Sequence, residues 1–148
     1  MMRKMLFAAV LAMATAGSTT AWAEAPAPSA TGSARIAFQK SGGFAGIDQT
    51  ITITRDGAAR VRGAARIAEF RLTDGEFRSL RRELDAVSTW RSSSAGCDIA
   101  DHFTYTLSHR GRQATRCHEV PADWRPAVVR LEGLIDRALA DRAAVPRG

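Results

Sequence analysis

The sequence contains few of the residue patterns on which enzymes rely. Three of its 148 residues are histidines, and none of them lies in an H-E-x-x-H or H-x-H pattern. The serines at 92–94 lack the G-x-S-x-G context of a nucleophile elbow. No glycine motif that could cradle a phosphate leads into a helix, because Gly42 and Gly43 precede a strand-like run. These absences predict a protein that is not an enzyme and that needs no cofactor.

Residues that could bind a metal are equally sparse. Asp98, Asp101 and His102 lie close together in the sequence. Short clusters of this kind directly before a strand usually cap or turn the chain, because Asp side chains bond to nearby backbone groups. The sequence therefore predicts no metal site.

Positive charge is present but is not concentrated. The chain has 21 Lys and Arg against 15 Asp and Glu, which gives a net charge of +6. Removal of an N-terminal segment with Arg3 and Lys4 lowers this charge to +4 and leaves Lys40 as the only lysine. The arginines are scattered between acids and lack the interleaved aromatics of a nucleic-acid-binding stripe. We expect a solvated surface and no nucleic-acid partner.

No hydrophobic run is long enough to span a bilayer. The run from Met5 to Ala16 follows Arg3 and Lys4 and precedes the small residues of the segment 21–23. This order is typical of a secretory signal peptide, here residues 1–23. No cysteine adjoins the cleavage point, so lipid attachment there is excluded. We expect a periplasmic or secreted protein that does not bind the membrane after cleavage.

The rest of the chain is predicted to be one domain between two weakly anchored ends. Residues 24–33 are rich in Pro, Ala, Ser and Gly, which predicts a flexible leader. Residues 142–148 are expected to form a disordered tail. A single compact domain fits residues 34–141. We expect a monomer.

Cys97 and Cys117 are the only cysteines. In an exported protein such a pair predicts one disulfide bond. The bond would close a loop of about 20 residues and contribute about 3 kcal/mol in the chain-entropy model. A hairpin about Gly111 places Cys117 opposite residue 104 or 105, so the bond is expected to tie the loop at 92–101 back over that hairpin.

Alternating apolar residues predict an antiparallel sheet of about five strands. The expected strands are residues 35–40, 50–54, 59–62, 102–108 and 113–119.

Two helices are expected to cover one face of this sheet, which gives an α+β fold and leaves the other face or the loops for function. The first begins after Thr73, whose spacing from Glu76 is that of a capping box, and runs to about Val87. The second follows Pro121. Its buried residues should be Trp124, Val128, Leu131, Ile135 and Leu139.

A glycine-rich loop with an aromatic residue at its centre is the most informative segment. It consists of Ser41, Gly42, Gly43, Phe44, Ala45, Gly46 and Ile47. Glycine permits a positive φ or the close approach of another segment. The ring of Phe44 can either turn into the core or fill a partner's pocket, as aromatic hot spots do. The sequence leaves both positions open.

Several features together resemble emfourin, the family of protein inhibitors of protealysin and other thermolysin-like zinc metalloproteases. The resemblance covers nearly all of residues 35–140. Its features are a strand from Lys40 into the 41–47 segment, a short strand before the Leu72–Thr73 helix start, the strand with Asp101 and Tyr105, and the helix led by Pro121.

The resemblance implies an α+β domain that has no catalytic activity and that reversibly blocks a thermolysin-like metalloprotease. Such proteases prefer a bulky apolar residue just after the scissile bond, so Gly43-Phe44 looks like a substrate. The expected protease-binding site is the loop from Ser41 to Ile47, with Phe44 in the specificity pocket. The alternative is a periplasmic or secreted interaction or structural domain without inhibitory activity. The export signal, the leader and the cysteine pair depart from the family pattern.

Overall fold

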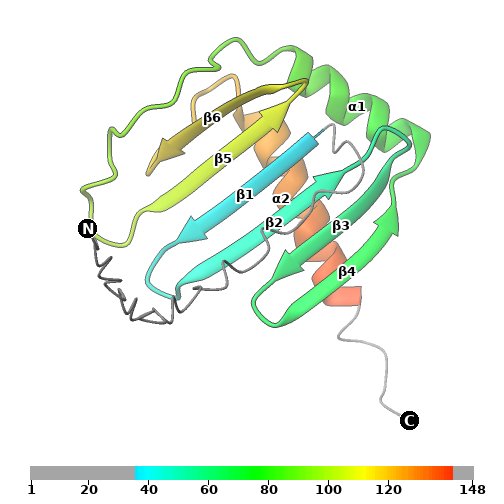
Figure 1. The fold of residues 1–148 in the computed structure, drawn as a ribbon, viewed down its shortest axis with the longest axis horizontal. Coiled ribbons are helices and arrows are strands. Elements are labelled where there is room, and N and C mark those ends of the chain that lie inside the picture. The colour runs from blue at the N-terminus through cyan, green and yellow to red at the C-terminus, as the bar shows by residue number, and fades with distance from the viewer. Residues whose placement is uncertain (1–35, 142–148) are drawn as a thin grey trace, which may run out of the picture.

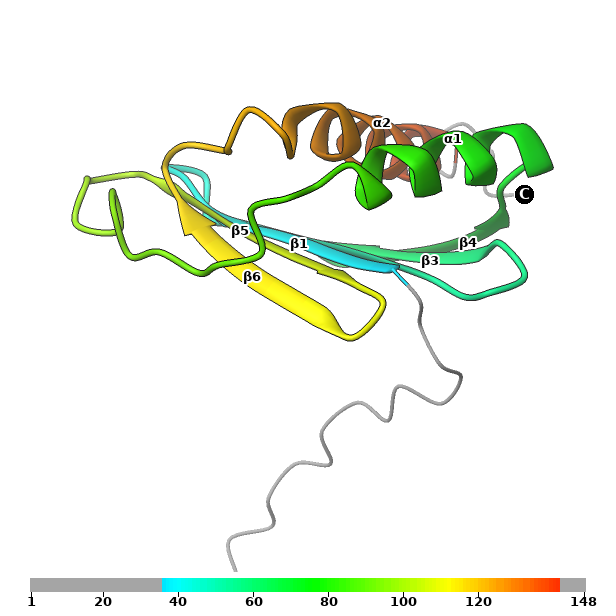
Figure 2. The same ribbon diagram turned by 90° about the horizontal axis from the view of Figure 1, so that it is seen from above.

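Six antiparallel strands form one sheet, and two helices lie across one of its faces (Figure 1; Figure 2). The computed structural model describes residues 36–141, so the expected signal peptide, leader and tail lie outside the described residues. The expected α+β class is confirmed, with one strand more than the five expected. The elements are β1 (Ile36–Gly42), β2 (Ile47–Ile53), β3 (Ala58–Gly63), β4 (Arg66–Arg71), α1 (Asp74–Asp85), β5 (Phe103–His109), β6 (Arg112–Cys117) and α2 (Arg125–Asp141).

The order of the strands, β4-β3-β2-β1-β5-β6, places the first strand at the centre of the sheet. β1 to β4 follow one another as hairpins, and α1 with the segment after it carries the chain to the other side of β1. Gly42, the last residue of β1, is consequently opposite Ile47 on one side and Phe103 on the other. The end of β1 is therefore enclosed between the first residues of β2 and β5.

The additional strand is β4, which pairs with β3 from Arg66 to Arg71. Its apolar pattern is weak, because Ala68 is buried, Phe70 is only partly buried and Ile67 is 46% exposed. The turn before it also lacks the usual signal, since Ala64 adopts the positive φ that glycine or asparagine more often supplies. Pairing with β3, rather than its own pattern, makes this segment a strand.

The core lies between the sheet and the two helices. Trp124 is completely buried directly before α2, and its Nε1 donates to the Thr89 carbonyl at 2.9 Å. Neither helix within residues 36–141 is long and apolar enough to cross a membrane. The largest fully buried aliphatic and aromatic side chains, besides Trp124, are Phe38, Ile36, Ile51, Ile53, Leu80, Leu84, Leu107, Leu131, Ile135 and Val61.

The first helix begins as its sequence predicts, whereas the second begins at Arg125, four residues after Pro121, so Trp124 precedes it and is not part of it. The Glu76 N–H donates to Thr73 Oγ1 and the Thr73 N–H donates to Glu76 Oε2, which are the two hydrogen bonds of a capping box. α1 ends at Asp85, two residues before the expected limit, although Val87 beyond it is still buried. Leu139 in α2 is only partly buried.

Candidate functional site

The Phe44 loop (residues 41–47) is a tight connection between two paired strands. Ser41 lies in β1 and is half-buried, and Ile47 begins β2 and is also half-buried. Between them the Gly46 N–H donates to the Gly43 carbonyl at 3.0 Å and closes a turn. Phe44 and Ala45 occupy the two central positions of that turn and are exposed.

The side chain of Phe44 points away from the protein. It is 94% exposed, the highest value among the large hydrophobic side chains of residues 36–141 that lie on the surface. The alternative in which this ring packs into the core is therefore wrong. Full burial of a phenylalanine side chain is worth roughly 2 to 3 kcal/mol, and the folded chain does not obtain this from Phe44.

The start of β5 supports the loop from one side. The Gly43 N–H donates to the His102 carbonyl at 3.0 Å. A Cβ atom on Gly42 would lie 2.4 Å from the same carbonyl oxygen, and a Cβ atom on Gly43 would lie 2.6 Å from the Phe103 ring. Both contacts are too short for any residue other than glycine without rearrangement. Gly46 has no such neighbour, but its φ of +59° favours glycine.

A polar and aromatic cluster lies at the base of the loop on the helix side of the sheet. Lys40 Nζ is 2.7 Å from Glu132 Oε1 of α2 and 4.5 Å from the centre of the Phe103 ring. Burial raises the pKa of the Tyr105 hydroxyl, and the nearby charge of Lys40 opposes that rise. The cluster joins β1, β5 and α2 beneath the loop. Sequence reasoning missed it, although the alternation of β1 places Lys40 on the same face as Ile36 and Phe38.

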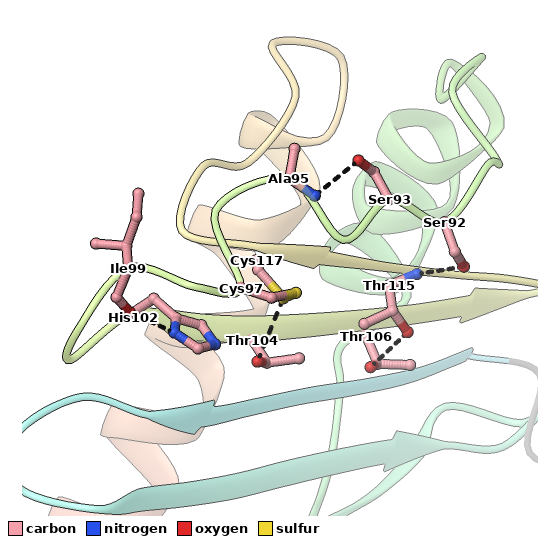
Figure 3. The surroundings of a disulfide bond; sticks show 10 residues. All are labelled: Ser92, Ser93, Ala95, Cys97, Ile99, His102, Thr104, Thr106, Thr115 and Cys117. Carbon is pink, nitrogen blue, oxygen red and sulfur yellow. Dashed lines mark hydrogen bonds between the residues drawn. A yellow bond between two sulfur atoms is a disulfide. The ribbon is translucent and has the colours of Figure 1, made fainter.

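The disulfide loop (residues 86–102) runs along β6 and reaches this end of the molecule at Cys97. It contains no helix or strand, yet it is attached to the fold at several points. The Ser93 N–H donates to the Thr115 carbonyl at 3.0 Å, and Cys97 forms a disulfide with Cys117 (Figure 3). Cys117 pairs with Thr104 across the β5–β6 hairpin. The expected disulfide and its path over the hairpin are both confirmed.

One carboxylate holds the beginning of the disulfide loop. Asp123 Oδ2 accepts hydrogen bonds from the backbone N–H groups of Ser88 and Thr89, at 2.9 and 2.8 Å. Burial raises the pKa of Asp123, but these hydrogen bonds lower it by more, to about 2. The carboxylate is therefore ionised at neutral pH, which strengthens both bonds.

The second half of the disulfide loop, from Cys97 to His102, lies at the same end of the sheet as the Phe44 loop (Figure 1), whereas its first half runs along β6 from the other end, where Trp90 packs against His109. Ile99 of the disulfide loop is 43% exposed and adds a second apolar side chain at this end. Among residues 36–141 the other exposed large hydrophobic side chains are Ile67 of β4 and Val129 of α2. Two exposed apolar side chains, one on each loop, thus occupy the end of the molecule at which β1 and β5 meet.

The described residues do not bring Asp98, Asp101 and His102 together as one group. His102 lies instead beside the disulfide, and one of its ring nitrogens is within 4.8 Å of the sulfur atoms of Cys97 and Cys117. Since those sulfurs are bonded to each other, they are not metal ligands in this state.

The geometry of the site supports binding through an exposed aromatic side chain on a well-supported loop. Comparisons of the chain with protein-family models, with curated proteins and with solved structures find no match.

Proposed function

We propose that the protein is an exported inhibitor of a thermolysin-like zinc metalloprotease and that it inserts the Phe44 loop into the active-site cleft. The exposure of Phe44, at 94%, is the observation that supports the proposal most strongly. A large apolar ring that contributes little to its own fold is available to fill a partner's specificity pocket. The proposed partner, a thermolysin-like metalloprotease, is the class that the resemblance to the emfourin family implies.

The loop's internal hydrogen bonds give a reason why it would bind without being cleaved. Cleavage of the Gly43–Phe44 bond requires that the Gly43 carbonyl be polarised by the protease's zinc ion. In this chain the Gly46 N–H already donates to that carbonyl, which holds the segment as a turn instead of an extended peptide. The loop can therefore offer Phe44 as a substrate does, while its peptide bond stays away from the attack geometry.

Both ends of the loop are fixed before a partner arrives. The residue pairs Gly42–Ile47 and Gly42–Phe103 belong to the sheet, and the Gly43 N–H is bonded to His102. A loop that is ordered in the free state loses little conformational entropy on docking. The disulfide is compatible with the oxidising compartment that export would reach.

The test is a comparison of inhibition and stability in the variant Phe44→Ala. The mature chain should inhibit members of a panel of thermolysin-like enzymes, and the variant should inhibit them about 100-fold less well. Its melting temperature should stay within about 2 °C of the wild-type value, because the ring is exposed. Ile67→Ala is the matched control, since Ile67 is an exposed apolar residue of β4, outside the Phe44 loop.

Undiminished inhibition by Phe44→Ala would contradict the binding mode. If the wild-type chain inhibits no member of the panel, the inhibitor function itself is wrong, and the alternative of a protein-interaction domain takes its place.

A further inference from the structure

Three groups that bind metals well meet beside the β5–β6 hairpin. The sulfur atoms of Cys97 and Cys117 and a ring nitrogen of His102 all lie within 4.8 Å of one another. We propose that these three side chains bind one Zn²⁺ ion when the disulfide is reduced to two thiols. This proposal does not depend on the inhibitor function.

His102 is oriented as a metal ligand would be. Its Nδ1 is 2.8 Å from the Ile99 carbonyl oxygen, and a carbonyl can only accept a hydrogen bond, so Nδ1 carries the proton in the neutral ring. The lone pair is then on Nε2. Figure 3 shows Nδ1 turned toward Ile99 and the other ring nitrogen on the side of the disulfide. Histidines that bind metals commonly donate their second N–H to a carbonyl in this manner, which fixes the ring.

The rearrangement that zinc binding requires is small. Tetrahedral zinc with bonds of about 2.3 Å to sulfur and about 2.0 Å to nitrogen separates its ligands by roughly 3.5 to 3.8 Å. The sulfurs must move apart by about 2 Å from their bonded distance, and the ring nitrogen must approach them by at most about 1.3 Å. Cys117 is buried in β6, whereas Cys97 is exposed in the disulfide loop and can make most of this movement. A water molecule would complete the coordination.

The disulfide and the zinc ion exclude each other. A dithiol reductant transfers two electrons and two protons to the Cys97–Cys117 bond, gives two thiols and is itself oxidised to a disulfide. Zn²⁺ then displaces the two thiol protons, which pass to the solvent, and is bound by two thiolates and the neutral imidazole. The ion replaces the covalent bond between the loop and β6 with a metal-mediated one.

Cobalt(II) is a suitable spectroscopic probe for this site. The chain is reduced under nitrogen, the excess reductant is removed, and Co²⁺ is added. We expect sulfur-to-cobalt charge-transfer absorption that saturates at one equivalent and disappears when Zn²⁺ is added. The oxidised protein should give no such band. His102→Gln should weaken Co²⁺ binding by at least about tenfold, since loss of a ligand should cost no less than loss of its supporting partner.

His118→Gln is the matched control for that variant. His118 follows Cys117 directly but is not part of the three-residue group. Its substitution should leave the cobalt affinity of the reduced protein within about twofold of the wild-type value. Equal weakening by His118→Gln and His102→Gln would contradict the ligand set.

Thermal unfolding supplies a second readout, in case reduction destabilises the chain. Zn²⁺ should raise the melting temperature of the reduced protein, or restore its folded circular-dichroism spectrum, and should not do so after both thiols are alkylated. The proposal is overturned if the reduced wild-type chain neither binds cobalt through sulfur nor gains stability from zinc. It is also overturned if His102→Gln binds Co²⁺ as tightly as the wild type.

Discussion

The Phe44 loop and the second half of the disulfide loop lie at the same end of the sheet, but the two loops are held by different interactions. The Phe44 loop depends on its own glycines and on the strands that flank it, since Gly42 and Gly43 lie against the start of β5. The disulfide loop depends on partners far away in the sequence, such as Asp123, which is 35 positions from Ser88. A short loop can thus be shaped by backbone conformation, whereas a long one needs separate anchors.

Removal of the cross-link should have the largest effect and should act on the disulfide loop first. Replacement of Cys97 and Cys117 by serine in one variant removes a bond that closes a separation of 20 positions and should lower the free energy of unfolding by about 3 kcal/mol. Urea unfolding measures this change.

Limited proteolysis of the same variant tests whether the two loops are independent. Cleavage should become faster within residues 94–101 and not within the Phe44 loop, which keeps its contacts with β2 and β5. Faster cleavage at both loops would show that the cross-link supports them together.

Glycine replacements compare two positions within the Phe44 loop. Gly42→Ala places a Cβ atom 2.4 Å from the His102 carbonyl oxygen at a φ of +107° and should cost about 2 kcal/mol. Gly46→Ala meets no atom within 4 Å and should cost about 1 kcal/mol, from its positive φ alone. Chemical denaturation of both variants gives the two values, and equal losses would mean that contact with β5 does not shape the loop.

Acid should loosen the start of the disulfide loop through Asp123. The folded pKa of about 2 is below the usual value of 3.8, so the unfolded chain binds the proton more readily. The stabilisation is therefore present above about pH 4 and is lost as the pH falls toward 2. Because Asp123 is partly exposed, we expect about 1 kcal/mol from it at pH 7.

Asp123→Asn should remove that contribution and speed hydrogen exchange at the Ser88 and Thr89 amides, which NMR can follow. Asp56→Asn is the matched control, because the pKa of Asp56 is also lowered to about 2, chiefly by hydrogen bonds from Thr54 and Arg71. Asp56→Asn should change how the stability of the protein depends on acid pH, but it should leave hydrogen exchange at the Ser88 and Thr89 amides unchanged. Unchanged exchange in Asp123→Asn would show that other contacts hold this segment.

The parts of the fold that depend on nearby residues were predictable. The capping box of Thr73 and Glu76 lies within four residues, and the hairpin around Gly111 predicted Cys117 opposite residue 104 or 105, where it pairs with Thr104. Two cysteines allow a single pairing, so the disulfide followed from their number. In each case the signal and the structure it specifies lie close together or have no alternative.

The parts that depend on tertiary neighbours were not predictable. The salt bridge between Lys40 and Glu132 joins residues 92 positions apart and exists only because α2 crosses the central strand. The position of His102 beside both the Phe44 loop and the disulfide follows from the pairing of β5 with β1. The outward direction of the Phe44 ring required the turn geometry that the sequence left open.

The direction of β1 has a practical consequence for experiments with this chain. The strand begins at Ile36 and ends at Gly42, so its first residue lies about 20 Å from the end that bears Phe44 (Figure 1). A bead, sensor chip or fluorescent label that is coupled ahead of Ile36 should leave the aromatic tip facing the solution. Capture through the amino end is therefore the orientation in which a soluble enzyme can reach it.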